Sequence, residues 1–152
     1  MGLFDKLKAA VNFVTGGAAK VQIEYTPHTA VAGQPINVKV TATGTAEVKS
    51  GGIFVDLRAV EKVSVSKKDS IELDSDLNMS FETFEQEFKI AEAFVLAKDE
   101  TKVFEGTINM PANVQPSFAG KYVSHDWEIR GRVEAKGNDP DSGFQPMKVN
   151  PA

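Results

Sequence analysis

Residues 123–136 read VSHDWEIRGRVEAK, and this stretch decides the fold. Its odd positions, from Val123 through Trp127 and Ile129 to Val133, are mainly apolar, whereas every even position is polar or charged. Successive side chains of a strand point to opposite faces, so a period of two predicts a strand with one face in a core and the other in water. This division is typical of an antiparallel sheet with one solvated side.

The same alternation recurs in shorter segments along the chain. It is found in residues 19–25, 36–41 and 53–59, and residues 147–149 could supply a final short strand. Turn-forming residues separate these segments, as at residues 137–140, which read GNDP. Several alternating segments between turns predict an all-β chain folded as an antiparallel β-sandwich.

The first 16 residues differ, because their apolar side chains recur with the period of an α-helix. At about 100° per residue, the apolar side chains of residues 3–14 fall on one face, and two glycines then end the pattern. We therefore expect a short amphipathic helix in residues 1–16 and a sandwich domain in residues 17–152. The candidate residues for contact with a membrane or a partner are Leu3, Phe4, Lys6, Leu7, Lys8 and Val11.

The apolar stripe of this helix has three alternative uses. It could pack on the chain's own sandwich, grip a groove of a partner protein, or lie in a membrane surface while Lys6 and Lys8 reach the head groups. Two lysines supply only about 2 kcal/mol of attraction to an anionic membrane, which is too little for stable anchoring.

Composition excludes several classes of protein. The chain has 152 residues, of which 41% are hydrophobic and 25% charged, as expected of a soluble globular domain. A net charge of -4 argues against a nucleic-acid partner. There are no cysteines, which excludes disulfides and thiolate metal sites. Since there is neither a membrane-spanning apolar run nor a clean signal peptide, we expect a cytoplasmic location.

No catalytic constellation stands out in the sequence. The only histidines are His28 and His125, and the chain contains neither a nucleophile elbow nor a zinc-protease helix nor a phosphate-binding loop. His125 is in register with the apolar side of its stretch, beside Trp127, so we expect a hydrogen-bonded core histidine. The sequence therefore predicts that the protein is not an enzyme and that it has no catalytic residues.

Two acidic residues of the same stretch invite a second catalytic interpretation. Asp126 and Glu128 lie two apart on one strand face, as a pair of hydrolytic carboxylates would. However, Arg130 and Arg132 share that face, so cross-strand ion pairs are the simpler interpretation.

One acidic segment has the spacing of a calcium-binding loop. Oxygen-bearing side chains occupy the six liganding positions of such a loop, namely Asp74, Asp76, Asn78, Ser80, Glu82 and Glu85. Met79 stands where the sharp turn of the loop needs glycine, and the preceding residues 63–73 do not read as an entering helix. We therefore expect no metal and no cofactor, and a calcium-dependent module is an alternative. Glu72, Asp74 and Asp76 also alternate as in a charged edge strand.

Residues 85–111 read EQEFKIAEAFVLAKDETKVFEGTINMP, and residues 120–122 then lead into the long alternating stretch. Aromatic residues end one strand, a charged turn follows, and the next strand closes at a proline corner. In this pattern the chain resembles the N-terminal domain of the arrestin-like family, and in particular the bacterial sporulation-control proteins of that group. The matching positions are Phe88, Phe94, residues 98–100, Val103, Phe104, Ile108, Pro111, Trp127, Ile129 and Val133.

The resemblance implies an immunoglobulin-like sandwich and a non-enzymatic adaptor or regulatory role in binding other proteins. It also favours a strand for residues 81–91, whose apolar spacing by itself slightly favours a helix. Arrestin-like proteins usually have two sandwich lobes, whereas this chain has room for one, and a homodimer could replace the missing lobe. The alternative functions are a peripheral membrane-binding module that uses the N-terminal helix and a calcium-dependent binding module.

Overall fold

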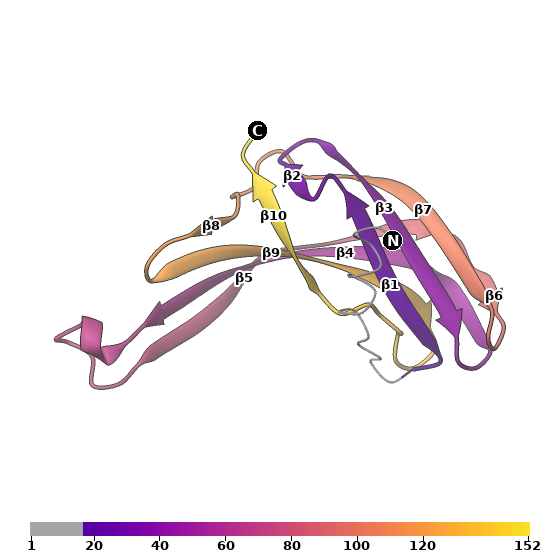
Figure 1. Cartoon of the computed structure of the whole chain (residues 1–152), viewed down its shortest axis with the longest axis horizontal. Coiled ribbons are helices and arrows are strands. Elements are labelled where there is room, and N and C mark those ends of the chain that lie inside the picture. The colour runs from indigo at the N-terminus through magenta and orange to yellow at the C-terminus, as the bar shows by residue number, and fades with distance from the viewer. Residues whose placement is uncertain (1–16) are drawn as a thin grey trace, which may run out of the picture.

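A computed structural model of the chain describes residues 17–152, which form two β-sheets packed face to face (Figure 1). The predicted helix of residues 1–16, with its candidate contact residues, lies outside the described residues. The predicted all-β class is confirmed. Within the described part the only helical element is one short 3₁₀ turn, η1 (Lys67–Asp69). The strands are β1 (Ala19–Thr26), β2 (Thr29–Val31), β3 (Pro35–Gly44), β4 (Val48–Val65), β5 (Leu77–Ala91), β6 (Phe94–Leu96), β7 (Thr101–Asn109), β8 (Phe118–Ala119), β9 (Val123–Ala135) and β10 (Gln145–Asn150).

The two sheets differ in size. The smaller sheet has the strand order β1-β3-β7, and the larger has the order β2-β10-β9-β4-β5, with β6 pairing with β4 and β8 with β9. Neighbouring strands are antiparallel except β2 and β10, which pair in parallel. The smaller sheet covers only one part of the larger. The C-terminal end of β4 and the N-terminal ends of β5 and β9 reach well beyond it (Figure 1).

The core lies between the sheets where they overlap. The side chains of Trp127, Ile129 and Val133 on β9 are at most 1% exposed, so the apolar face that the sequence predicts is confirmed. Gly131 lies between them, where the two sheets approach each other closely. A Cβ atom on Gly131 would lie 3.1 Å from the Val40 side chain and 3.3 Å from Cβ of Ile23. A larger residue at this position would therefore force the side chains of Val40 and Ile23 to shift.

The hairpin of β4 and β5 contains both confirmed and wrong predictions. The ambiguous segment 81–91 is confirmed as a strand, since it lies in β5. β4 is much longer than the predicted strand at residues 53–59, because it pairs with β9 along almost its whole length. The prediction of a charged edge strand at residues 72–76 is wrong. These residues form a loop, which the Asp76 carboxylate closes by accepting a hydrogen bond from the backbone N–H of Lys67 at 2.9 Å.

Replacing Gly131 by valine tests the packing of the sheets. We expect Gly131→Val to lower the free energy of unfolding by about 1–3 kcal/mol, since the added methyl groups must displace Val40 and Ile23. Urea denaturation measures this change. Glu134→Val, at an exposed position of the same strand, is the control and should change stability by less than about 0.5 kcal/mol. Equal stability of the two variants would contradict the close approach.

Candidate functional site

The inner face of the larger sheet continues past the end of the core onto the β4–β5 hairpin. The hydrophobic cluster of the core ends at a row of three side chains, Ala59 of β4, Trp127 of β9 and Phe84 of β5. In the next row of the same face, Glu61 stands between His125 and Phe81. Beyond the core, this face has no second sheet over it within residues 17–152 (Figure 1).

Large apolar side chains are exposed on this uncovered face. Met79 is 45% exposed, Phe81 48% and Phe118 41%. By contrast, the side chains of Ala59 and Trp127, which lie in the last row of the core on the same face, are at most 1% exposed. The strand registers place Val63 and Val123 beside them. We call these five residues the hairpin face: Val63, Met79, Phe81, Phe118 and Val123. Exposed apolar patches of this kind mark sites of interaction on soluble proteins.

A β-bulge turns the aromatic side chains of β5 to this side. Ala59 pairs with Phe84 and Val60 with Glu82, so Thr83 is the extra residue on β5. The bulge keeps both Phe81 and Phe84 on the inner face although they are three residues apart. This spacing is the reason that the sequence of the segment resembles a helix.

His125 holds the bulge in place from β9. Its Nε2 atom lies 2.7 Å from Oγ1 of Thr83, whose hydroxyl is also 3.2 Å from the carbonyl oxygen of Ala59. Its Nδ1 atom donates to the carbonyl oxygen of Pro116 at 3.0 Å, and the Phe118 ring stacks on it with 6.4 Å between centroids. The imidazole is 1% exposed, so the predicted core histidine is confirmed. It joins β9, the bulge of β5 and the segment before β8.

The outer face of the larger sheet carries ion pairs. Asp56, which is 3% exposed, accepts hydrogen bonds from Nε of Arg130 at 2.9 Å and from Nε of Arg132 at 3.1 Å. The guanidinium of Arg58 donates to Glu128 at 2.8 Å and lies 3.8 Å from the centroid of the Phe144 ring. The predicted cross-strand ion pairs are therefore confirmed.

Arg132 is the most strongly held of these groups. Burial by itself lowers the pKa of its guanidinium, but hydrogen bonds to Asp56 and Asp139, together with the charges of Asp56 and Glu87, outweigh that effect and raise the pKa above its ordinary value. Arg132 thus stays charged and ties β4, β5 and β9 together at the root of the hairpin.

The outer edge of β5 is open. β5 pairs with β4 on one side, and no other strand of residues 17–152 pairs with its free side. Two exposed carboxylates on this strand, those of Glu82 and Glu85, have no ion-pair partner in the described part of the chain. Glu85 stands opposite Arg58 in the strand register, but that guanidinium is bound to Glu128. The edge therefore carries uncompensated negative charge.

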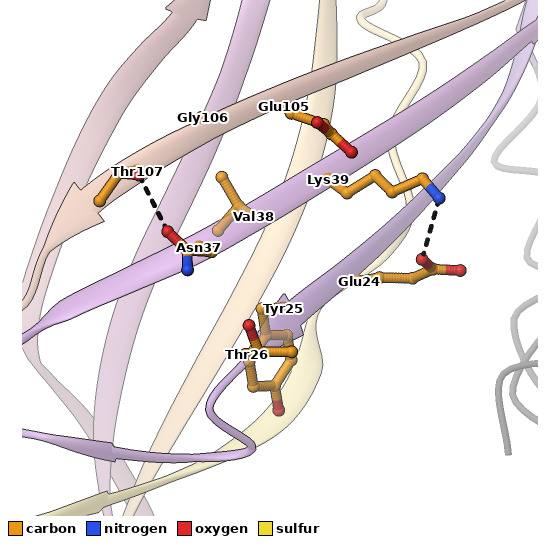
Figure 2. A pocket seen from close by; sticks show the side chains of 9 residues that line it. All are labelled: Glu24, Tyr25, Thr26, Asn37, Val38, Lys39, Glu105, Gly106 and Thr107. Atoms are coloured by element: carbon orange, nitrogen blue, oxygen red, sulfur yellow. Dashed lines mark hydrogen bonds and ion pairs between the residues drawn. The ribbon is translucent and has the colours of Figure 1, made fainter.

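A hollow of about 470 Å³ lies on the smaller sheet, and Figure 2 shows its side chains on three neighbouring strands. Lys39 of β3 lies between two glutamates and forms an ion pair with Glu24 at 3.7 Å, and the Thr107 hydroxyl donates to Oδ1 of Asn37 at 2.9 Å. Because these polar groups bind one another, the hollow has the character of a solvated sheet face with cross-strand pairs.

A second hollow, of about 850 Å³, opens where β10 diverges from β9. Its lining includes His28, His125 and Phe118. Tyr25 closes one side by donating its hydroxyl to the carbonyl oxygen of Pro146 at 3.1 Å, and burial raises the pKa of this phenol. The hollow adjoins the hairpin face at Phe118.

The residues of the calcium spacing do not come together as ligands. Asn78, Ser80 and Glu82 lie on the extended strand β5, whereas Asp74 and Asp76 lie in the loop before it. Among residues 17–152, no three acidic or histidine side chains are grouped closely enough to hold a metal ion. The same residues include no helix that is long and apolar enough to cross a membrane.

The two sheets, their strand order and the single described lobe define an arrestin-like β-sandwich. Among the solved structures similar to this chain is that of Spo0M, the sporulation control protein of Bacillus subtilis, with a TM-score of 0.62 and 17% sequence identity. The match covers 90% of this chain and 51% of Spo0M, so the chain spans about half the length of that protein. The expected arrestin-like fold is thereby confirmed. No protein-family model and no curated protein matches the sequence.

Sequence reasoning placed the candidate site in residues 1–16 and missed the hairpin face. In the sequence, Met79 stands out only within the calcium spacing, and Phe81 only within the ambiguous apolar segment 81–91. The available signal was the acidic and aromatic composition of residues 77–87 in a strand without proline.

The contact between Thr83 and His125 generates a stability prediction. We expect Thr83→Val to lower the free energy of unfolding by about 1–2 kcal/mol, since it leaves the buried Nε2 atom of His125 without a partner. Thr83→Ser keeps the hydroxyl and should retain most of that stability. Urea denaturation of both variants measures the difference, and a valine variant as stable as the serine variant would contradict the role of the hydroxyl.

Proposed function

We propose that this chain is a non-enzymatic adaptor module of the cytoplasm, which binds a partner protein through the hairpin face. The observation that carries the proposal is the exposure of Met79, Phe81 and Phe118 on a sheet face that is continuous with the core. Burying such side chains against a partner contributes about 25 cal/mol per Å² of apolar surface. A soluble protein that keeps them exposed has a use for them.

Polar contacts on both faces of the hairpin support this proposal. The Asp56–Arg132 pair lies on its outer face and the His125–Thr83 contact on its inner face. A surface held in this way loses little conformational freedom when a partner binds, and this lowers the cost of association.

The pair of Thr83 and His125 needs a separate argument, because 2.7 Å is also the distance between a nucleophile and its general base. Three observations support a structural role. The imidazole is 1% exposed, its Nδ1 atom donates to a backbone carbonyl group rather than to a carboxylate, and Thr83 lines neither of the two hollows. The proposal therefore assigns this pair to holding the bulge.

The fold supports a regulatory setting for the module. One of the similar solved structures is that of a sporulation control protein, and we propose a control function of that kind for this chain.

A photoreactive side chain at position 81 tests the proposal in the native cell. We expect p-benzoylphenylalanine in place of Phe81 to yield a discrete covalent adduct with another protein after illumination, because this side chain is 48% exposed on the hairpin face. The matched control carries the same side chain at Val103, which is 52% exposed on β7 of the smaller sheet. Gel electrophoresis and mass spectrometry identify the adducts.

Comparison with the control position distinguishes specific binding from random collision. The same adducts at positions 103 and 81 would indicate random collision, and no adduct at position 81 would contradict the proposal. An adduct that contains only two copies of this chain would also contradict it, since an adaptor needs a different partner.

A further inference from the structure

We propose that the open edge of β5 binds an extended, basic segment of the partner as an added β-strand. The inference rests on the proposed function and names the chemistry of the partner. The edge runs from Leu77 to Glu87. Nearer the core, β7 packs against β5, where a Cβ atom on Gly106 would lie 3.1 Å from Ile90.

The backbone of β5 supplies the first part of the argument. Every second residue of an edge strand points its N–H and C=O groups away from the sheet, where they can pair with another strand. Natural edges are usually blocked by short length, by proline or by lysine. β5 has 15 residues, contains no proline, and has its one lysine, Lys89, near the core end, in an ion pair with Glu92 at 2.8 Å.

The charge of the edge selects the partner. Glu82 and Glu85 are exposed on the outer face and have no ion-pair partner within residues 17–152. The bulge at Thr83 brings both to the same face. Cross-strand pairs of opposite charge stabilise a sheet, whereas like charges opposite one another destabilise it. A strand that adds here is therefore favoured when lysine or arginine faces the two glutamates.

A second copy of this chain fits the edge less well. Pairing two β5 edges would bring Glu82 and Glu85 of both copies into one seam, and the like charges would repel. The acidic residues thus oppose self-association and leave the edge open for a basic partner.

The two faces of the edge predict a sequence pattern. A partner strand would point one set of side chains to the inner face, beside Met79 and Phe81, and the other set to the outer face, beside Glu82 and Glu85. The partner segment should therefore alternate apolar and basic residues with a period of two. A basic amphipathic helix could cover the hairpin face, but it would leave the backbone groups of β5 unpaired.

A designed peptide tests the pattern on the full chain. The probe is an end-blocked, fluorescently labelled peptide of about nine residues that alternates lysine with valine or isoleucine, which is within the usual length of a strand. We expect fluorescence anisotropy to show saturable binding that weakens as salt is added. A peptide of the same composition, with all lysines at one end, should bind at least about 10-fold more weakly, since it cannot match both faces. Equal binding of the two peptides would overturn the proposal.

N-methylation of the peptide distinguishes strand addition from other contacts. One version is methylated at the amides of all odd-numbered peptide residues, and the other at those of all even-numbered residues. In a bound strand only one of these two sets of N–H groups faces β5, so only one version loses the groups that pair with it. We expect one methylated peptide to lose binding and the other to retain it. Retention by both versions, or loss by both, would overturn strand addition.

Charge variants test the role of the two glutamates. Glu82→Gln with Glu85→Gln should weaken binding of the alternating peptide by about 5-fold and reduce its salt dependence. The matched control is Glu105→Gln with Glu134→Gln, which removes the same charge from exposed positions on β7 and β9 and should leave the affinity unchanged. Equal weakening in both pairs would show a general charge effect and contradict the assigned site.

The two proposals can fail separately. A partner adduct at position 81 without binding of the alternating peptide would contradict the addition of a basic strand but would still support the adaptor function. Peptide binding without any adduct in the cell would leave a strand-binding edge, and the adaptor function would fall. Light scattering that shows dimers of the free chain, lost on Phe81→Glu, would overturn the inference, because the edge would then belong to a second copy.

Discussion

Burial of apolar side chains between two sheets of unequal length is the constraint on which the rest of the structure depends. The smaller sheet packs on the larger one around Gly131, where only a residue without a side chain lets the backbones approach so closely. From there the core runs along β9 to Trp127 and ends in one row with Ala59 and Phe84. Beyond this row the sheet continues without a partner layer in residues 17–152, so the same alternation that builds the core also builds an exposed apolar surface.

Polar contacts keep the uncovered hairpin in a sheet conformation. On the outer face, Asp56 binds two arginines of β9, and Arg132 also reaches Glu87 of β5 at 2.9 Å. On the inner face, His125 ties the bulge of β5 to β9. Such contacts add little to stability at an exposed surface, but a partly buried network with several hydrogen bonds is worth more. The hairpin is thus held by directional contacts where the hydrophobic contribution is weak.

The sequence predicted the fold well because alternation is a direct consequence of a half-buried strand. The core face of β9 and the core position of His125 followed from it, and the ion pairs of Glu128, Arg130 and Arg132 followed from the charges on the other face. The extent of β4 could not be predicted, since Glu61 and Lys62 follow Ala59 without an obvious apolar period. The hairpin face was missed for a related reason. Alternation tells which face of a strand Phe81 occupies, whereas its exposure depends on where the smaller sheet ends, and this is set by packing between segments far apart in the sequence.

Amide hydrogen exchange of the free, full-length chain, followed by NMR, tests most directly whether the hairpin is an open docking surface. The account predicts strong protection for the amides of residues 55–59, which lie in the core of the larger sheet. Along residues 77–87 it predicts an alternation, in which amides that face β4 are protected and those that point outward exchange nearly as fast as in an unfolded peptide. Uniform protection along residues 77–87 would show that the edge is already covered in the free protein, and would contradict the account.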